Sequence, residues 1–199
     1  MYPFLETIKI DHGQVKDLEF HQRRMDKTIR DLRHAINPIQ LSEQIICPAH
    51  LRDQLVKCRV LYDLNALEIS FESYFPKKKQ YFRAVHAATR FYPYKYADRS
   101  AIDGLLLQKR AYDDIIIVVE GMVTDSSIAN LVFRKNKWLY TPEQPLLEGI
   151  KRQRYIDQGK IRTRKILISE LSTYDAFKCI NAMMDLEDSN WLPVSNIIF

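Results

Sequence analysis

The sequence is poor in cysteine and glycine, and each shortage argues against a class of protein. Its three cysteines, Cys47, Cys58 and Cys179, are odd in number and widely spaced, which favours reduced thiols over a disulfide framework. Cys47 and His50 are separated by two residues, but no second pair completes a zinc site, so we expect no metal. Among the five glycines we find no glycine-rich dinucleotide fingerprint.

Signals for membranes and export are also lacking. No apolar run approaches the roughly 20 residues that a membrane-spanning helix needs. Residues 1–6 contain no basic segment followed by an apolar stretch, so we expect no export signal. Together with the unpaired cysteines, this predicts a cytoplasmic protein without a membrane partner. An apolar content of 46% over 199 residues is typical of a globular chain of one or two domains.

The charge of the chain does not identify the class of its binding partner. The formal net charge is +5, and the only basic run, Lys77–Lys79, follows Pro76 and predicts a solvated loop. Nucleic-acid binding would need a basic face with interleaved aromatics or a known module, and neither is evident, so we expect no nucleic-acid partner. An acidic substrate or a phosphate-bearing cofactor agrees equally well with this charge.

Apolar periodicity predicts an α+β chain. Helical spacing covers 18–35, and a second helical stretch, kinked at Pro48, is expected over 41–56. Strand patterns occupy 5–10, 58–63, 67–74, 81–87, 115–119, 131–133, 137–142, 161–168 and 177–182. A helix is expected to open at Gly149, where free backbone donors would suit a phosphate. The aromatic joint 91–94 contains a proline, and we place the boundary between lobes 1–90 and 91–199 there.

A polar stretch lies between two of these apolar strands. Asp125, Ser126, Ser127 and Asn130 follow the run 115–119 and precede the strand that begins at Leu131. A turn held on a rigid frame can present fixed hydrogen-bonding groups to a ligand. The alternative is a tight turn whose Asp and Ser satisfy their own backbone.

Lys95 stands between Tyr94 and Tyr96, just before a helix that Asp98 could cap and that would run to about Ala111. Partial burial would lower the pKa of such a lysine toward the range of a Schiff-base amine. The alternative is an ordinary surface lysine.

Six motifs occur in the order found in the class IV aminotransferases, the pyridoxal-phosphate enzymes of the branched-chain aminotransferase, D-amino-acid aminotransferase and aminodeoxychorismate lyase type. The motifs are Phe4–Ile8, His21–Met25, Lys95 ahead of an Asp-Arg step, Val123–Asn130, Leu147–Arg152 and Pro193–Val194. The chain resembles this family over nearly its whole length. The resemblance implies a two-lobe fold, with a small α/β sandwich lobe over 1–90 and a larger lobe with a pseudo-barrel sheet over 91–199 that carries the lysine.

The resemblance also implies a role for each matching residue. Lys95 would form the Schiff base with pyridoxal 5'-phosphate and act as acid and base, while Asp125 would keep the pyridine nitrogen protonated. Arg59 could meet a substrate carboxylate, although a charge on the sheet surface is an equally good interpretation, and Asn130 is a further substrate-binding candidate. The phosphate would be held by Arg24, Ile150, Lys151, Asn181 and Ala182.

The chain departs from the family in three places. Asp125 replaces the usual glutamate, which shortens the reach by about 1.5 Å on the scale of a single bond. Lys151 replaces the usual threonine, and no hairpin precedes the strand that starts at Phe4. An aminotransferase uses that N-terminal segment to help wall its substrate pocket, so these changes bear on cofactor depth and substrate choice.

Within the family the motif set most resembles the aminodeoxychorismate lyases, which release pyruvate and 4-aminobenzoate. One alternative is an aminotransferase acting on a D- or branched-chain amino acid, in which the amino group stays on the cofactor. A second alternative is a non-catalytic binding or regulatory member. In either catalytic case the partner is a small-molecule amine, and the family implies a homodimer.

Overall fold

Two sheets, each with its own apolar core, organise the chain, of which the computed structural model describes residues 2–188 and 191–199. The sheets belong to two compact units. The first consists of Met1–Lys77 and Tyr94–Asp98, and the second of Lys78–Pro93 and Arg99–Phe199. The combination of these sheets with separate helices confirms the expected α+β class.

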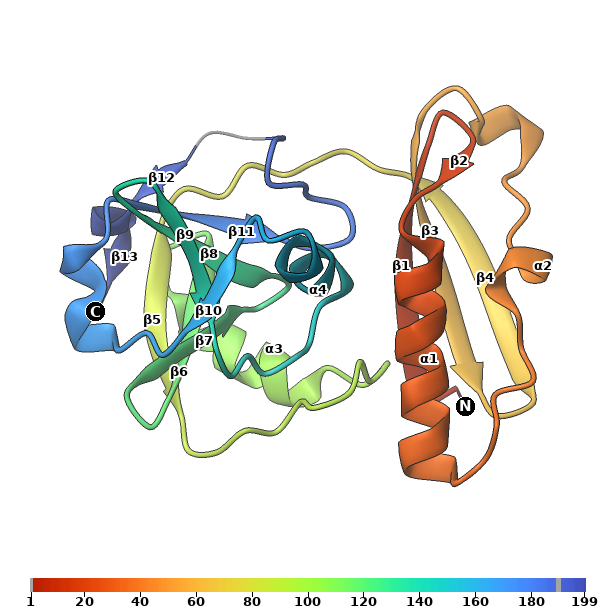
Figure 1. The fold of residues 1–199 in the computed structure, drawn as a ribbon, viewed down its shortest axis with the longest axis horizontal. Helices are drawn as coiled ribbons and strands as arrows, with labels where there is room; N and C mark the ends of the chain where they lie inside the picture. The colour runs from red at the N-terminus through yellow and green to blue at the C-terminus, as the bar shows by residue number, and fades with distance from the viewer. Residues whose placement is uncertain (1, 189–190) are drawn as a thin grey trace. The chain divides into compact units, whose positions relative to one another are not determined.

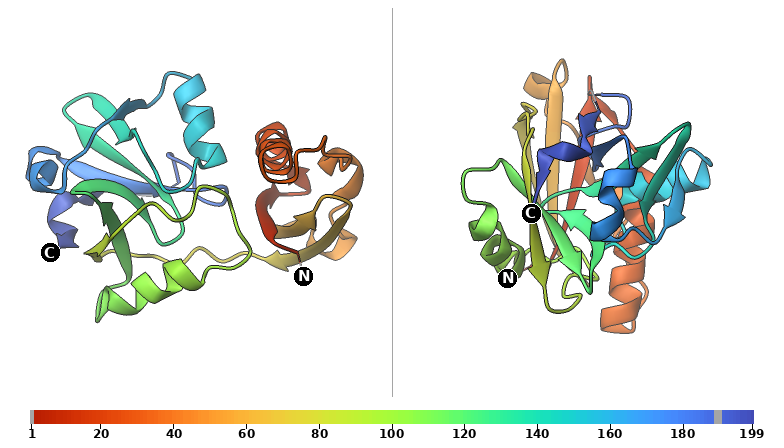
Figure 2. Two further views of the ribbon diagram at one scale, coloured as in Figure 1. Left: turned by 90° about the horizontal axis from the view of Figure 1, so that it is seen from below. Right: turned by 90° about the vertical axis from the view of Figure 1, so that its left-hand side faces the viewer.

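The first unit is a four-stranded sheet in the order β2-β1-β3-β4, with α1 along one face (Figures 1 and 2). Its elements are β1 (Phe4–Asp11), β2 (Gln14–Val15), α1 (Leu18–Arg33), α2 (Leu41–Gln44), the 3-10 helix η1 (Ala49–Leu51), β3 (Leu55–Asp63) and β4 (Ala66–Ser73). Successive strand residues point to opposite faces, so Ile8 and Ile10 of β1 meet Met25 and Ile29 of α1 in one core. The expected amphipathic helix and paired strands are confirmed.

The expected helical stretch over 41–56 is wrong. The chain forms only the single turn of α2 and the short η1 there, and β3 already begins at Leu55. Pro48 precedes η1 with an extended backbone, φ −57° and ψ 141°, because proline removes a helix donor and crowds the preceding turn. Leu41 and Leu51 are nevertheless buried, so the apolar spacing reflects core positions rather than one helix.

The segment Tyr94–Asp98 packs with the first unit through β1. Leu5 N–H donates to the carbonyl of Lys95 at 3.0 Å, Ala97 N–H donates to the carbonyl of Pro3 at 2.9 Å, and Phe4 forms an antiparallel bridge with Tyr96. This division differs from the expected boundary at 90/91, which placed Lys95 with the larger lobe. Backbone pairing with β1 is the physical reason for the difference.

The second unit is built on a nine-stranded sheet that curls strongly (Figures 1 and 2). The main path runs β10-β9-β8-β7-β6-β5-β13, and β11 joins β8 to β12. Its strands are β5 (Phe82–Ala87), β6 (Asp114–Val119), β7 (Met122–Ser126), β8 (Asn130–Lys135), β9 (Trp138–Pro142), β10 (Arg162–Arg164), β11 (Ala176–Ile180), β12 (Leu192–Pro193) and β13 (Ile197–Ile198). Its helices are α3 (Ser100–Leu106) and α4 (Ile150–Asp157), with 3-10 helices η2 (Leu107–Lys109), η3 (Ile168–Thr173) and η4 (Val194–Asn196).

The β6–β7 hairpin places the polar stretch. Every residue of β6 is buried, as its β-branched run predicted, and the strand turns at Glu120 and Gly121, whose φ values are 51° and 74°. Two consecutive positive φ angles define a turn that matches the twist of a hairpin, and Gly121 adopts one without strain. Asp125 and Ser126 then belong to β7 itself, and Asn130 is the first residue of β8.

Two further expectations about elements of this unit are wrong. The helix expected between Lys95 and about Ala111 begins at Ser100 and ends at Leu106, and Arg99, not Asp98, is the residue that directly precedes it. The strand expected over 161–168 is confined to Arg162–Arg164. In the first case backbone hydrogen bonds hold Tyr94–Asp98 against β1, so the helix starts only after this segment.

Candidate active site

Asp125 is a buried carboxylate at the end of β7, with 5% of the residue exposed. One carboxylate oxygen accepts a hydrogen bond from Nδ2 of Asn130 at 2.7 Å, and the other accepts one from Leu147 N–H at 2.9 Å. Strand pairing brings Asp125 opposite Asn130, and the loop before α4 supplies Leu147. The structure therefore places together two of the residues that the sequence singled out.

Burial raises the pKa of Asp125 to about 6, against the lowering effects of the Leu147 and Asn130 hydrogen bonds and of the Arg152 charge. A carboxyl group with this pKa is mostly ionised at neutral pH. It can thus offer negative charge to a protonated ring nitrogen inside a poorly hydrated site, where such a pairing is stronger than in water.

The start of α4 lies beside this carboxylate. Gly149 directly precedes the helix, and a glycine has no side chain that could cap the first turn. Backbone donors at a helix start suit an anion such as a phosphate. The expected contributors Ile150 and Lys151 are the first two residues of the helix, and both side chains are buried.

Lys151 directs its ammonium group to Asp185, which lies in the turn that follows β11. Lys151 is 1% exposed, and a buried cation near a helix start is unfavourable without a counter-charge. The ion pair therefore ties the beginning of α4 to the turn that contains Asn181 and Ala182. Sequence reasoning did not anticipate Asp185, because no short-range pattern links the two positions.

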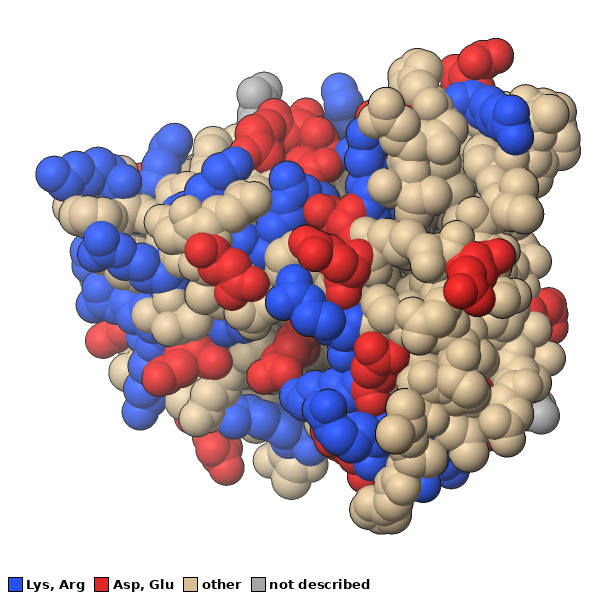
Figure 3. Space-filling view, turned by 45° about the vertical axis from the view of Figure 1, so that its right-hand side comes forward, with Lys and Arg blue, Asp and Glu red and all other residues tan. Residues whose placement is uncertain are grey.

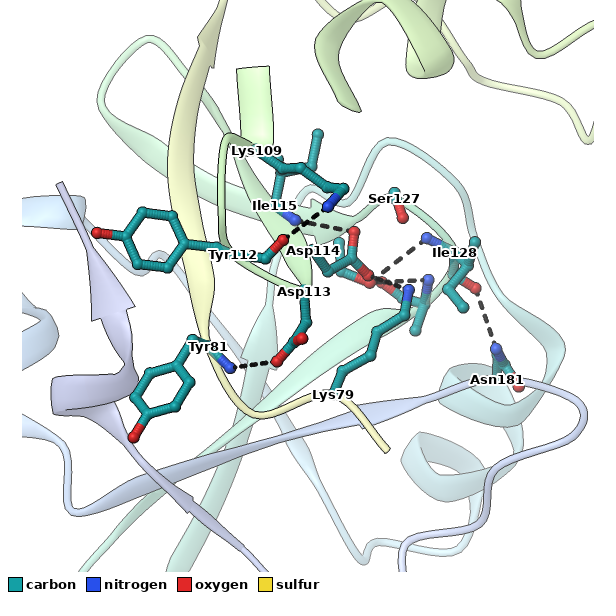
Figure 4. A network of polar contacts seen from close by, with 12 residues as sticks. Lys79, Tyr81, Lys109, Tyr112, Asp113, Asp114, Ile115, Ser127, Ile128 and Asn181 are labelled. Carbon is teal, nitrogen blue, oxygen red and sulfur yellow. Dashed lines mark hydrogen bonds and ion pairs between the residues drawn. The ribbon is translucent and has the colours of Figure 1, made fainter. Parts of the chain in front are cut away.

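Asn181 holds the turn between β7 and β8. Its Nδ2 donates to the carbonyl of Ile128 at 3.1 Å, and its side-chain oxygen accepts from Met183 N–H at 2.9 Å. Figure 4 shows this side chain directed at Ile128, with Ser127 nearby in the same turn. Arg99 donates to the carbonyl of Ser127 at 2.9 Å, so the turn is held from α3 as well.

In the first unit, Glu6 lies fully buried between β1 and α1. Nε and Nη2 of Arg24 donate to its two oxygens at 2.8 and 2.6 Å, and Nδ1 of His21 donates at 2.6 Å. Burial alone would raise the pKa of Glu6, but the Arg24 charge and the bonds from His21 and Arg24 lower it to about 2. Arg24, the expected phosphate anchor, is thus oriented by a bidentate contact.

Lys95 is half-buried, and its backbone is fixed by Leu5, the residue before Glu6. Arg59 lies elsewhere in the same unit. It is exposed on β3 opposite Thr7, whereas its neighbours Cys58 and Val60 face the core under α1. Arg59 therefore occupies the face of the sheet opposite the Glu6–Arg24 contact, and the structure does not bring the two arginines together.

Glu6 and His21 lie within two of the motifs, but the sequence alone assigns no role to either. One signal was available, because Glu6 interrupts the apolar alternation of Phe4, Ile8 and Ile10, and an acid on the core face of a strand needs a partner. The identity of that partner depends on how α1 packs on the sheet.

Charged groups of both signs are interspersed on the face drawn in Figure 3, so the excess of basic residues forms no uniform basic surface there. Within residues 2–188 and 191–199, no group of three His, Cys, Asp or Glu side chains could hold a metal ion. No helix in the described part of the chain is long and apolar enough to cross a membrane.

This two-unit fold, with a buried carboxylate beside the start of a helix, agrees with the class of enzymes that bind pyridoxal phosphate. The family model for class IV aminotransferases matches residues 4–197, and the chain belongs to this family of pyridoxal-phosphate-dependent enzymes. The resemblance drawn from the six motifs is confirmed.

Individual proteins and solved structures are also similar to this chain. An uncharacterized protein of Haemophilus influenzae is 37% identical over 188 residues, which cover 94% of this chain and 100% of that protein. A solved structure from Haemophilus somnus 129PT, provisionally named a 4-amino-4-deoxychorismate lyase, is 35% identical with a TM-score of 0.87, covering 94% of this chain and 98% of that one. A Mesorhizobium loti structure, provisionally named an amino-acid aminotransferase, shares the fold at 18% identity and a TM-score of 0.78, covering 96% and 97%.

Proposed function

We propose that this chain is a pyridoxal-phosphate-dependent lyase that converts aminodeoxychorismate to pyruvate and 4-aminobenzoate. The observation that carries the proposal is the 35% identity to the Haemophilus somnus structure provisionally named for this reaction, because it extends over nearly the whole of both chains. Family membership supports the cofactor class, and the individual reaction is the step that needs an experiment.

The residues of the second unit suit pyridoxal phosphate. Asp125 would keep the proton on the pyridine nitrogen, and the backbone at Ile150, Lys151, Asn181 and Ala182 would bind the phosphate. When bound, the cofactor supplies an electron-accepting ring for the reaction at the substrate α-carbon. The buried Asp125 carboxylate and the position of Ile150 and Lys151 at the start of α4 support these two roles.

Motif matches to the family in the first unit give three further proposed roles. Lys95 is the amine that would bind the cofactor aldehyde and move the proton at the substrate α-carbon. Arg24, held by Glu6, would add a charge-assisted bond to the phosphate. Arg59 would attract the substrate carboxylate. We further propose a cytoplasmic homodimer, on family resemblance alone.

The test is a product analysis of purified protein supplied with pyridoxal phosphate. Aminodeoxychorismate should yield 4-aminobenzoate and pyruvate in equal amounts, and Lys95→Ala should yield neither. The exposed Lys78 offers a matched control, since Lys78→Ala should leave the yield unchanged. Absence of both products from the wild-type protein, with the cofactor bound, would rule out the lyase proposal.

The second candidate is an aminotransferase acting on a D- or branched-chain amino acid, which the description of the matching family favours. The same preparation should then form α-keto acids from an amino-acid panel, without 4-aminobenzoate from aminodeoxychorismate. A protein that shows no absorbance change with added pyridoxal phosphate, or that keeps its activity in Lys95→Ala, would instead support a non-catalytic or different role.

A further inference from the structure

We propose that Asn130 is a positioning residue that fixes the Asp125 carboxylate to the loop before α4, and that Gly149 lacks a side chain because the Asn130 amide occupies that space. The proposal rests on the proposed function in one respect, since it takes Asp125 to be the partner of the cofactor ring nitrogen. It replaces the expected substrate contact of Asn130 with a different role.

The geometry of the Asn130 amide supports this role. Its Nδ2 donates to Asp125 at 2.7 Å and to the carbonyl of Leu147 at 2.8 Å, so both amide hydrogens are engaged. The orientation is set by these partners, because a flipped amide would place its oxygen against a carboxylate and a carbonyl. Both hydrogens are therefore unavailable to a substrate.

Leu147 completes the arrangement from its other side. Its N–H donates to the second Asp125 oxygen at 2.9 Å, while its carbonyl accepts from Asn130. Asp125, Asn130 and Leu147 thus form a closed ring of three hydrogen bonds. Because Leu147 lies two residues before Gly149, the ring fixes the carboxylate relative to the start of α4.

Gly149 shows how tightly this ring is packed. A Cβ atom at this position would lie 1.9 Å from the side-chain oxygen of Asn130, which is too close for two non-bonded atoms. The backbone of Gly149 has φ −70° and ψ 142°, which any residue can adopt, so the requirement is for space and not for a left-handed conformation. The amide could yield only by breaking its bonds to Asp125 and Leu147.

The arrangement also affects the charge of Asp125. Burial raises the pKa of Asp125, and the Leu147 and Asn130 bonds together with the Arg152 charge oppose that rise. A further titratable neighbour is Cys179 on β11, whose own pKa burial raises to about 12, so it is neutral at physiological pH. Loss of the hydrogen bond from Asn130 would remove one of the interactions that oppose the effect of burial. The pKa of Asp125 would rise further, and the carboxyl group would be protonated at neutral pH. A neutral carboxyl group would hold a ring proton poorly.

The test measures Asp125 directly. Full-length protein labelled with carboxyl-¹³C aspartate is titrated by NMR without added cofactor, and the Asp125 signal is assigned by its loss in Asp125→Asn. We expect Asn130→Ala to raise the Asp125 pKa by about one to two units, the effect of one charge-assisted hydrogen bond. Gly149→Ala should also raise the Asp125 pKa.

Controls separate this effect from general damage. Gly104→Ala places a methyl group in open space within α3 and should leave the Asp125 pKa unchanged, as should Asn65→Ala on the exposed β3–β4 turn. Asn130→Asp keeps the size of the side chain and should produce two coupled carboxyl titrations, one strongly raised. Gly149→Ala, which keeps Asn130 but displaces its amide, keeps the test decisive if Asn130→Ala does not fold.

The second measurement is the dissociation constant for pyridoxal phosphate at pH 7. We expect Asn130→Ala and Gly149→Ala to weaken binding about tenfold, in proportion to the ionised fraction of Asp125 lost. A folded Asn130→Ala protein with an unchanged or lower Asp125 pKa would overturn the proposal. If the wild-type protein binds no pyridoxal phosphate, the proposed function fails, while the NMR titration still decides whether Asn130 controls Asp125.

Discussion

Replacing Glu6 by glutamine tests whether the Glu6–Arg24–His21 contact stabilises the first unit. Glu6 is fully buried and accepts hydrogen bonds from Arg24 and His21 through both oxygens. Glutamine keeps the shape but offers one acceptor oxygen, so its NH₂ group must face a donor of Arg24 or His21. The substitution also removes the Glu6 charge from the largely buried Arg24 guanidinium, whose side chain is 13% exposed.

The magnitude follows from the pKa of Glu6. Burial opposes ionisation, yet the Arg24 charge and the bonds from His21 and Arg24 lower the pKa from its ordinary 4.5 to about 2. That difference corresponds to about 3 kcal/mol of stability at neutral pH. Because the folded-state pKa is the lower one, this stability is present above pH 4.5 and is lost as the pH falls through about 2.

The pH profile of His21 must be separated from this effect. Burial lowers the pKa of His21 against the bonding and charge of Glu6, so the folded protein takes up this proton less readily than the unfolded chain and acid weakens folding through His21. Glu6→Gln also removes the Glu6 contribution to the His21 pKa. The difference in free energy of unfolding between the two proteins, followed against pH, therefore reports Glu6 together with this change at His21.

Hydrogen exchange by mass spectrometry suits this measurement. Both tryptophans, Trp138 and Trp191, belong to the second unit, so tryptophan fluorescence reports on that unit and is the internal control. Peptides from β1 and α1 should exchange their amide hydrogens faster in Glu6→Gln than in the wild-type protein. The increase should correspond to a loss of about 3 kcal/mol in the free energy of unfolding at pH 7. At lower pH the free energies of unfolding of the two proteins are extrapolated from denaturant titrations. The difference between these free energies should shrink as the pH falls from 4.5 to 2.

Asp63 gives a matched control in the same unit. Arg33 contacts it with the same bidentate geometry, at 2.9 and 3.2 Å, but both side chains are more than a third exposed. Asp63→Asn should therefore change the stability by less than about 1 kcal/mol. The reasoning is refuted if Glu6→Gln is as mild as Asp63→Asn at neutral pH, or if its effect does not diminish in acid.

Three further predictions concern the proposed site. Lys95→Ala should abolish product formation while circular dichroism stays unchanged, because truncating a half-buried lysine removes chemistry and little core. Asp185→Asn should destabilise the second unit by about 3–5 kcal/mol in urea denaturation, since it removes the negative charge that faces the buried Lys151 ammonium group, and Lys151→Met should cost less because Asp185 is 20% exposed. Arg59→Ala should change stability by less than about 0.5 kcal/mol but raise KM in steady-state kinetics.

Most of the longer strands and the main helix could be predicted because each depends on local alternation or helical spacing, whereas β7 contains Asp125 and Ser126, which the polar stretch predicted to lie in a turn. β6 is fully buried as its β-branched run required, and α1 starts at Leu18 as its apolar spacing required. The stretch 41–56 could not be predicted in the same way. Leu41, Ile45 and Leu51 are buried by tertiary packing, which produces helix-like spacing without a continuous helix.

The site shows the same division between local and long-range information. Family motifs predicted that Asp125 and Asn130 matter, and strand pairing places them opposite each other. The donor at Leu147, the counter-charge at Asp185 and the partners of Glu6 could not be read from the sequence, because each contact joins residues more than ten positions apart. Only the packing of strands, loops and helices decides which distant groups meet.

These contacts explain how Asp125 can stand where most members of the family have glutamate. Asp125 reaches about 1.5 Å less far than glutamate would, and its two oxygens are held by Asn130 and Leu147 rather than free to rotate. Any approach to a ring nitrogen must therefore come from the placement of β7 and of the loop before α4. The space left by Gly149 allows that loop to lie against Asn130. A short carboxylate can serve in such a site because the surrounding backbone, and not the length of the side chain, sets its position.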